Sequence, residues 1–337
     1  MERVQVAALI VPSGVSFGVD KPAGVVDPLA PIAGRSIPGW IVDAALGASV
    51  RRIALVAHDT NTPTRQELLQ RSDDALIEFV PPLRDVADTL SIAVERLGSE
   101  LTLREAAHIL VLPAECPQID TPQLRGFIDE HVASGAAATV GTSGSMESLV
   151  EPVVVRDENG LVASIADVAL GGVSLACVKA SLLIPALRRG TIAGWERGAP
   201  LGDLASVLAD AGHHVHHVTL PPSLVAIRSM TSRAVVEQQL RRRVIDHWLS
   251  LGVDIPVVGQ VAIDATVSLG PGVQLLPGSV LQGDTVVGEG AQIGPNTHLV
   301  DATVGCNAIV PSAVVRGSEV GSGEALTPFT VRSAPAS

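Results

Sequence analysis

The stretch that decides the fold runs from Ile263 to Leu299 and reads IDATVS LGPGVQ LLPGSV LQGDTV VGEGAQ IGPNTH L. Written in blocks of six, every block opens with an aliphatic residue, and a small or β-branched residue stands four places later. Neither the period of a helix nor that of a single strand gives this spacing. A period of six, with Gly, Pro, Asp and Asn at the corners, is typical of a parallel β-helix whose aliphatic side chains stack inward.

The same pattern continues beyond Leu299, with steps of five residues mixed among steps of six. The inward positions are then Val304, Val310, Val315, Val320 and Leu326. We therefore predict a β-helix domain over residues 253–332, followed by a tail at 333–337.

A polar segment precedes the repeats and follows the pair Pro221-Pro222. From Ser232 to Leu249 its apolar residues have helical spacing, which predicts a connector helix within residues 229–252. Its three consecutive arginines, residues 241–243, either bind an anion or lie on a solvated helix face. We favour the solvated face, because runs of charge on a helix are usually exposed to water.

Residues 1–228 alternate short apolar runs with amphipathic segments, which predicts a mainly parallel sheet covered by helices. The predicted strands are Val4–Val11, Ile53–Ala57, Ala75–Phe79, Ile109–Leu112, Ala138–Gly141, Val153–Arg156, Leu161–Ile165 and Val173–Val178. The predicted helices are Pro38–Leu46, Val86–Leu97, Pro122–Ala133 and Leu204–Ala211. We expect Thr121 to be the N-cap of the third helix and Asn159-Gly160 to form a hairpin turn.

Composition limits the function. The 337 residues are 47% hydrophobic but only 2% aromatic, and the formal net charge is −12. An acidic chain with few aromatic residues is a poor partner for nucleic acid. The three cysteines are widely spaced, as in a protein of a reducing compartment, and no apolar run reaches the ~20 residues of a membrane helix. We expect a cytoplasmic protein that binds neither nucleic acid nor membrane.

Several segments, taken in order, resemble one enzyme family. The segments are Ala8-Leu9-Ile10-Val11, Pro31-Ile32-Ala33-Gly34-Arg35, Ile41-Val42-Asp43-Ala44-Ala45, Val111-Leu112-Pro113-Ala114-Glu115-Cys116-Pro117, Val155-Arg156-Asp157-Glu158-Asn159-Gly160 and Gly202-Asp203-Leu204, followed by the connector and the hexapeptides. Together they resemble the bifunctional UDP-N-acetylglucosamine pyrophosphorylase / glucosamine-1-phosphate N-acetyltransferase family. The resemblance implies an α/β nucleotidyltransferase-like domain with a Rossmann-like mixed sheet, followed by a left-handed parallel β-helix.

The loop after the first strand is the expected nucleotide site. Its candidate residues are Pro12, Ser13, Gly14, Val15, Ser16 and Gly18, in a turn that would aim backbone N–H groups at phosphates. The family carries an Arg and a Lys in this region to neutralise the reacting phosphates. Here Gly18 and Asp27 fall near those positions, and Lys21 is the candidate substitute. The loss of such cations removes electrostatic stabilisation of the transition state.

The resemblance also implies which residues would bind a metal ion and a sugar. Glu115 takes the position of a family Asp that helps to hold Mg²⁺, and Thr231 takes that of a second ligand, an Asn. The family's uracil-reading segment falls near residues 83–88, without its glycines. Asp167 and Asp203 are the candidate sugar-binding acids, although Asp203 is also a candidate helix cap after Gly202.

Two further features each allow two interpretations, and a third, His298, allows one. Residues 213–217 read His-His-Val-His-His and would suit zinc, but the last strand of the α/β domain is the favoured interpretation. Cys116 is a candidate nucleophile, with a buried thiol preferred. In the family, the acetyl-transfer His lies in coils beyond the turn that corresponds to Thr327-Pro328-Phe329, and the sequence shortly after this turn is not expected to supply those coils. We therefore do not expect acetyltransferase activity. His298 lies before this turn, and we interpret it as a solvated side chain.

These observations lead to one favoured function and two alternatives. The favoured one is a protein of the pyrophosphorylase fold whose catalysis is weakened or lost, and which binds a nucleotide-sugar or serves as a regulator or scaffold. It would form a homotrimer through the β-helix, or assemble with an active relative. The first alternative is an active Mg²⁺-dependent nucleotidyltransferase that uses Glu115 and Lys21. The second is an acyltransferase acting through the β-helix.

Overall fold

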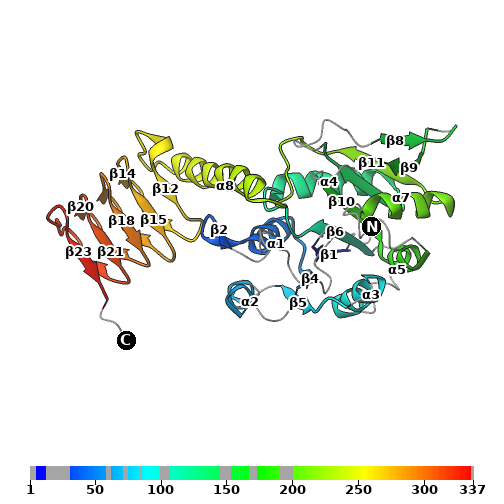
Figure 1. Cartoon of the computed structure of the whole chain (residues 1–337), viewed down its shortest axis with the longest axis horizontal. Helices are drawn as coiled ribbons and strands as arrows, with labels where there is room; N and C mark the ends of the chain where they lie inside the picture. Colours follow the sequence, from blue (N-terminus) through cyan, green and yellow to red (C-terminus); the bar gives the residue numbers. More distant parts are fainter. Residues whose placement is uncertain are drawn as a thin grey trace. The chain divides into compact units, whose positions relative to one another are not determined.

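The computed structural model describes residues 5–12, 31–57, 62–70, 75–83, 86–98, 107–144, 153–158, 160–166, 173–189 and 200–334. The chain divides into two compact units, one made of Met1–Ala30 and Ser36–Val236, the other of Pro31–Arg35 and Glu237–Ser337. Figure 1 gives the element labels used below. The expected fold class, a Rossmann-like mixed sheet followed by a left-handed parallel β-helix, is confirmed by the elements described below.

A seven-stranded sheet forms the centre of the first unit, in the order β11-β7-β10-β6-β1-β4-β5. Its strands are β1 (Gln5–Val11), β4 (Arg52–Val56), β5 (Leu76–Val80), β6 (Ala107–Pro113), β7 (Ala138–Thr142), β10 (Ser174–Lys179) and β11 (Val215–Thr219). All pairs are parallel except those of β10, which runs antiparallel to both β6 and β7. The predicted strands of this sheet therefore exist, with ends displaced by one or two residues.

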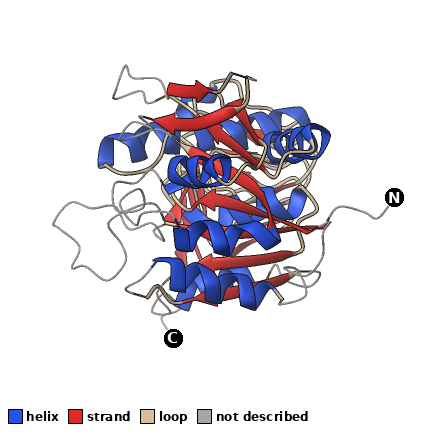
Figure 2. Ribbon diagram, turned by 90° about the vertical axis from the view of Figure 1, so that its right-hand side faces the viewer, coloured by secondary structure: helices blue, strands red, loops and turns tan. Residues whose placement is uncertain are grey.

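Helices cover both faces of this sheet, as Figure 2 shows. On one face α3 (Val86–Leu97), α5 (Ala180–Arg189) and α7 (Pro200–Asp210) pack on the odd-numbered side chains of β1, such as Leu9. On the other face α1 (Ile37–Gly47), α2 (Thr62–Leu69) and α4 (Thr121–Ser134) pack on the even-numbered ones, such as Ile10. Side chains of a strand alternate between its faces, so an apolar strand supplies two cores.

Helix caps explain two of the helix starts. At α1 the Ser36 side chain accepts a hydrogen bond from the Gly39 N–H (3.1 Å). At α4 the prediction that Thr121 is the N-cap is wrong. Asp120 is the cap: its carboxylate accepts from the Gln123 N–H (2.9 Å) while the Gln123 side chain accepts from the Asp120 N–H (3.1 Å). The carboxylate and amide satisfy two backbone donors at once, which a lone hydroxyl does not.

Shorter elements complete this unit. The predicted hairpin is confirmed: β8 (Val153–Arg156) and β9 (Val162–Ala166) pair antiparallel, and the Gly160 N–H donates to the Asp157 carbonyl (3.0 Å). The sequence pattern did not predict α2 and α5, the latter containing Pro185. It also missed a small hairpin of β2 (Pro31–Ile32) and β3 (Arg35–Ser36), whose residues 31–35 belong to the second unit.

The second unit contains the β-helix, built of three parallel sheets. One sheet has β12 (Ala262–Ile263), β15 (Val280–Gln282), β18 (His298–Val300), β21 (Val314–Arg316) and β23 (Val331–Ser333). The second has β13 (Ser268–Leu269), β16 (Val286–Val287), β19 (Thr303–Val304) and β22 (Glu319–Val320), and the third has β14 (Gln274–Leu275), β17 (Gln292–Ile293) and β20 (Ile309–Val310). The predicted inward residues pair in register, as Ile263 with Leu281 and Leu281 with Leu299, and all three are fully buried.

Helix α8 (Met230–Ser250) is the predicted connector helix and begins two residues earlier than expected. Ser229 Oγ accepts from the Ser232 N–H (3.1 Å), and Ser232 Oγ accepts from the Ser229 N–H (2.9 Å), so the two serines cap its start. Arg241 pairs with Glu237 and Arg242 pairs with Asp246, which disfavours the anion-binding interpretation of these arginines. Among the described helices, none has the length and apolar character that crossing a bilayer demands.

Candidate functional site

The direction in which the chain winds across the sheet changes between β1 and β6. From β1 the chain proceeds outward to β4 and β5, then returns to the other side of β1 to form β6. At the carboxyl ends of these two neighbouring strands the Ala114 N–H donates to the Val11 carbonyl (2.9 Å). In open α/β sheets ligands bind outside the carboxyl ends of strands at such a change of direction. The candidate site is therefore at the carboxyl ends of β1 and β6, formed by Val11, Pro12 and residues 113–115. We call this place the β1/β6 edge.

Glu115 lies at this edge, directly after β6, and its residue is only 7% exposed. Its carbonyl accepts from the Ile227 N–H (2.9 Å), so the segment leading into α8 is fixed beside it. Gln118 strengthens the same link, because its amide donates to the Ser223 carbonyl (3.1 Å) and accepts from the Val225 N–H (3.0 Å). The fold thus joins two segments more than 100 residues apart in sequence at the end of β6.

The other predicted site residues are only partly described. Pro12 is buried at the end of β1. Ser13, Gly14, Val15, Ser16, Gly18 and Lys21 lie outside the described residues, as does Asp167. Asp203 lies within α7, which begins at Pro200. The alternative interpretation of Asp203 as the helix cap is therefore wrong, because the helix starts three residues earlier.

Residues 215–217 of the histidine-rich segment lie in β11, so the favoured interpretation as the last strand of this domain is confirmed, and β11 is an edge strand of the sheet. His216 pairs with Glu130 (Nε2 to Oε1, 3.0 Å), and His217 is hydrogen-bonded to the Thr142 hydroxyl (2.8 Å). Burial lowers the pKa of His217, with smaller contributions from Arg156 and His216. The polar atoms of this strand therefore bond to α4 and β7, two elements of the same domain.

Two other predicted side chains have structural partners. Cys116 is fully buried and its thiol donates to Gln118 Oε1 (3.6 Å), which favours the predicted structural thiol over a nucleophile. The prediction that His298 is solvated is wrong. It is half-buried on β18, with Nε2 2.8 Å from Gln282 Oε1, because neighbouring coils place the two side chains near each other.

Comparisons with known proteins agree with this architecture. Over 318 residues the chain is 30% identical to the bifunctional protein GlmU of Bifidobacterium longum strain DJO10A, a match that covers 88% of this chain and 67% of that protein. This chain belongs to the GlmU family. It is also 25% identical to GlmU of Caldanaerobacter subterraneus subsp. tengcongensis (88% of this chain, 66% of that protein) and 27% identical to GlmU of Paenarthrobacter aurescens (89% and 62%). No family model matches the chain.

The chain spans about two thirds of the length of these GlmU relatives. The matched part includes both the sheet domain and the β-helix, since it covers 88–89% of this chain. The family expected from the order of the sequence segments is thereby confirmed.

The residues at the β1/β6 edge fit Mg²⁺ in part. Glu115 offers a carboxylate oxygen, the ligand type that Mg²⁺ prefers, at the position expected for the GlmU family. The second expected position, Thr231, is an exposed residue in the first turn of α8 and offers only a neutral hydroxyl. Mg²⁺ demands near-octahedral geometry and is usually held by one or two carboxylates together with substrate phosphates. Of the two expected positions, Glu115 therefore offers a suitable ligand and Thr231 a poor one.

One group of chemically capable side chains is not among the candidates that the sequence pattern suggests. His108 on β6, His131 on α4 and Cys177 on β10 converge in the sheet domain. They are distant in sequence and come from three elements that only the sheet order brings together. No local spacing motif signals them.

Proposed function

We propose that this chain is a sugar-1-phosphate nucleotidyltransferase-like protein of the UDP-N-acetylglucosamine pyrophosphorylase type. It binds a nucleotide or nucleotide-sugar at the carboxyl edge of β1 and β6. The observation that carries the proposal is the change of winding direction at these strands, with the buried Glu115 immediately after β6. The similarity to GlmU proteins over 88% of the chain supports a ligand of this class.

We further propose that catalysis is weakened or lost. The resemblance aligns Gly18 and Asp27 near the family's phosphate-binding Arg and Lys, so one cation is absent and another is replaced by an acid. Charge that develops on the transferring phosphoryl group needs such cations, and one removed group typically costs about 10²–10³ in rate. The working part would then be the binding pocket, in a regulatory or scaffold role.

The alternative is an active Mg²⁺-dependent enzyme. It would transfer a nucleotidyl group from a nucleoside triphosphate to a sugar 1-phosphate, with Glu115 holding the ion and Lys21 serving as the cation. Bound Mg²⁺ would neutralise phosphate charge. The observation in its favour is that a carboxylate residue is retained just after β6, where Glu115 is buried and its backbone carbonyl accepts from the Ile227 N–H.

The same proposal includes an oligomer. A homotrimer assembled through the β-helix, or a mixed trimer with an active relative, would suit a scaffold role. Light scattering of the full chain, alone and mixed with an active GlmU, measures this directly. A monomer under both conditions would remove the oligomeric part of the proposal and leave the binding part intact.

Two assays on the full chain test the function. The first is a thermal-shift panel of UTP, UDP-N-acetylglucosamine and other nucleotides, with and without Mg²⁺, since a ligand raises stability by RT ln(1 + [L]/Kd). The second measures pyrophosphate release across triphosphates and sugar phosphates. Nucleotide-dependent stabilisation with little turnover supports the favoured proposal. Robust turnover that Glu115→Ala abolishes would replace it with the active enzyme, and no shift with any nucleotide would contradict both.

A further inference from the structure

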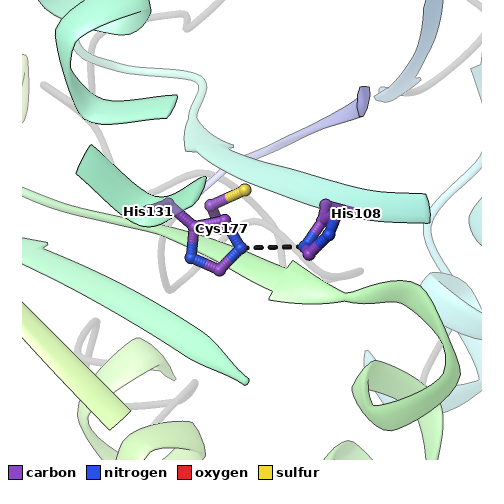
Figure 3. A group of neighbouring side chains, drawn as sticks. All are labelled: His108, His131 and Cys177. Carbon is purple, nitrogen blue, oxygen red and sulfur yellow. Dashed lines mark hydrogen bonds between the residues drawn. The ribbon is translucent and has the colours of Figure 1, made fainter. Parts of the chain in front are cut away.

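Three side chains that the proposed nucleotide site does not use meet inside the sheet domain. His108 extends from β6, His131 from α4 and Cys177 from β10, and Figure 3 shows their side chains gathered at one point. The ligand atoms of all three lie within 4.8 Å of one another, and all three residues are buried. Two imidazoles and a thiol form a donor set that suits a borderline-soft metal ion such as Zn²⁺.

The group lies near the amino end of β6, whereas Glu115 lies beyond its carboxyl end. His108 is the second residue of this strand. At about 3.3 Å per residue, His108 is roughly 16 Å along the strand from Pro113, the last residue of β6. In the antiparallel ladder Lys179 of β10 is paired with His108, and Cys177 is paired with Leu110 on one side and with Thr139 of β7 on the other. A ligand here would therefore act on the fold and not on a substrate at the β1/β6 edge.

The orientation of His131 is already set for ligation. Its Nδ1 is hydrogen-bonded to the Thr139 hydroxyl (2.8 Å), so its Nε2 is directed at His108 Nδ1, also 2.8 Å away. Metal-binding histidines almost always have their second ring nitrogen held by such a partner, which fixes the tautomer and the ring. The rings of His108 and His131 meet edge-on at 78°, with centroids 4.8 Å apart.

The electrostatic surroundings keep both imidazoles uncharged. Burial lowers the pKa of His131 to about 4, with smaller contributions from His108, Lys179 and His216. Burial and the nearby Lys179 lower the pKa of His108. A neutral imidazole is the form that binds metal, and the thiol is neutral too, because burial raises the pKa of Cys177.

We propose that His108, His131 and Cys177 form a zinc site that fastens α4 to β6 and β10. On binding, the S–H bond of Cys177 breaks, a bond forms between Sγ and the ion, and the proton leaves to solvent. In the metal-free protein one of the two facing nitrogens, His131 Nε2 or His108 Nδ1, carries the proton of the hydrogen bond between them. On binding, that ring changes tautomer and its proton moves to its other nitrogen, so that both facing nitrogens donate lone pairs and neither imidazole changes charge. Ligand bonds of 2.0–2.1 Å in a tetrahedron separate two nitrogens by roughly 3.3 Å, so the histidine pair opens by about 0.5 Å. Water completes the tetrahedron.

Metal content of the full chain tests the site. The protein is purified without a polyhistidine tag, stripped with a chelator, and dialysed against Zn²⁺ before its metal is counted. The wild type should retain one zinc per chain, and Cys177→Ser and His131→Gln should lose it. Cys306→Ser and His247→Gln should retain it, because both of these residues are exposed and lie outside the group.

A matched pair of threonines on β7 tests the geometry. Thr139→Val removes the hydroxyl that holds His131, and the affinity for Zn²⁺ should fall about tenfold or more. Thr142→Val removes the equivalent bond to His217 and should leave the affinity unchanged. Equal effects of the two changes would show that the hydroxyls act through folding and not through the metal.

Cobalt gives a direct spectroscopic signature. Co²⁺ bound to the wild type should show a thiolate-to-metal charge-transfer band in the near ultraviolet that Cys177→Ser lacks. The proposal is overturned if the folded wild type retains no zinc, or if zinc survives in Cys177→Ser and is removed instead by changes in residues 213–217. If His131→Gln fails to fold by circular dichroism, Cys177→Ser and Cys177→Ala still decide the result, because they are small changes of one side chain.

Discussion

Gly34 lies directly against Asp264: a Cβ on residue 34 would overlap the Cβ of the aspartate. Gly34 also has a φ of 80°, in the turn between β2 and β3. The neighbouring Ala33 carbonyl accepts from the Ala265 N–H (2.9 Å), so the turn is bonded to the first coil of the β-helix unit. The segment Pro31–Arg35, which is part of the family resemblance, thus contacts residues some 230 positions later in the sequence.

This contact predicts a strong effect of Gly34→Ala. The substitution adds a left-handed backbone cost of about 1–2 kcal/mol and a steric overlap with Asp264. Gly252→Ala is the matched control, since Gly252 has a φ of 85° but a methyl group added there would meet no atom within 4 Å. Urea unfolding should show a larger loss of stability for Gly34→Ala than for Gly252→Ala. Equal losses would show that the overlap is relieved without cost.

Asp264 itself predicts a pH dependence. Burial raises the pKa of this carboxyl, and the pairing with Arg241 (3.3 Å) and a bond from the Gly283 N–H offset part of the rise. The folded state therefore holds this proton more tightly than the unfolded chain, in which the carboxyl has its ordinary pKa of 3.8. The two states differ in protonation in a pH window that begins near 3.8 and extends above it. The contribution of Asp264 to stability should decrease as pH rises through this window.

The measurement compares wild type with Asp264→Asn at pH 4 and pH 7. The stability of the wild type relative to the variant should be lower at pH 7. Asp246→Asn is the control, because Asp246 is exposed and also pairs with a neighbouring arginine, Arg242. A wild-type advantage that grows toward pH 7 would contradict the prediction and show that the Arg241 pairing dominates.

The inward stack of the β-helix predicts a large core effect at Leu299. This side chain is fully buried and is in register with Leu281 on one side and Val315 on the other. Leu299→Ala should reduce the free energy of unfolding by about 2–5 kcal/mol, since it removes buried methyl groups and leaves a cavity. Val286→Ala on the neighbouring sheet should cost far less, because Val286 is exposed. Chemical denaturation of both variants gives the comparison.

Introducing an Arg at position 18 and a Lys at position 27 tests the proposal that catalysis is weakened there. Gly18→Arg combined with Asp27→Lys should raise the rate of pyrophosphate release at least about 100-fold above the parent chain, because each cation stabilises charge in the transition state. Adding Glu115→Ala to this variant should abolish the gain. A parent chain that is already active and slowed by the double change would instead support Lys21 as its working cation.

The β-helix was predictable because one inward residue per six is a local signal that neither a helix nor a plain strand gives. The strands of the sheet were predictable for a similar reason, since each is a continuous apolar run buried on both faces. The caps were harder. Thr121 and Asp120 are adjacent and both are good N-cap residues, and only the reciprocal bonds with Gln123 distinguish them.

The candidate sites differ in how much the sequence reveals. Glu115 was identified through its place in a family segment, and the structure adds the bonds from residues 223–227 that no local pattern contains. The histidines of 213–217 attracted a metal hypothesis because they are adjacent in sequence. The group that does converge, His108 with His131 and Cys177, depends on the antiparallel insertion of β10 between β6 and β7, which is a property of topology.

The coils of the β-helix are not all the same length. Leu269 pairs with Val287, 18 positions later, whereas Val287 pairs with Val304 after 17 and Val304 with Val320 after 16. The deleted residues come from the corners, so the aliphatic stack is unbroken. Corners are therefore the places where evolution, or an engineer, can lengthen or shorten this solenoid, and a peptide grafted there would be displayed without disturbing its interior.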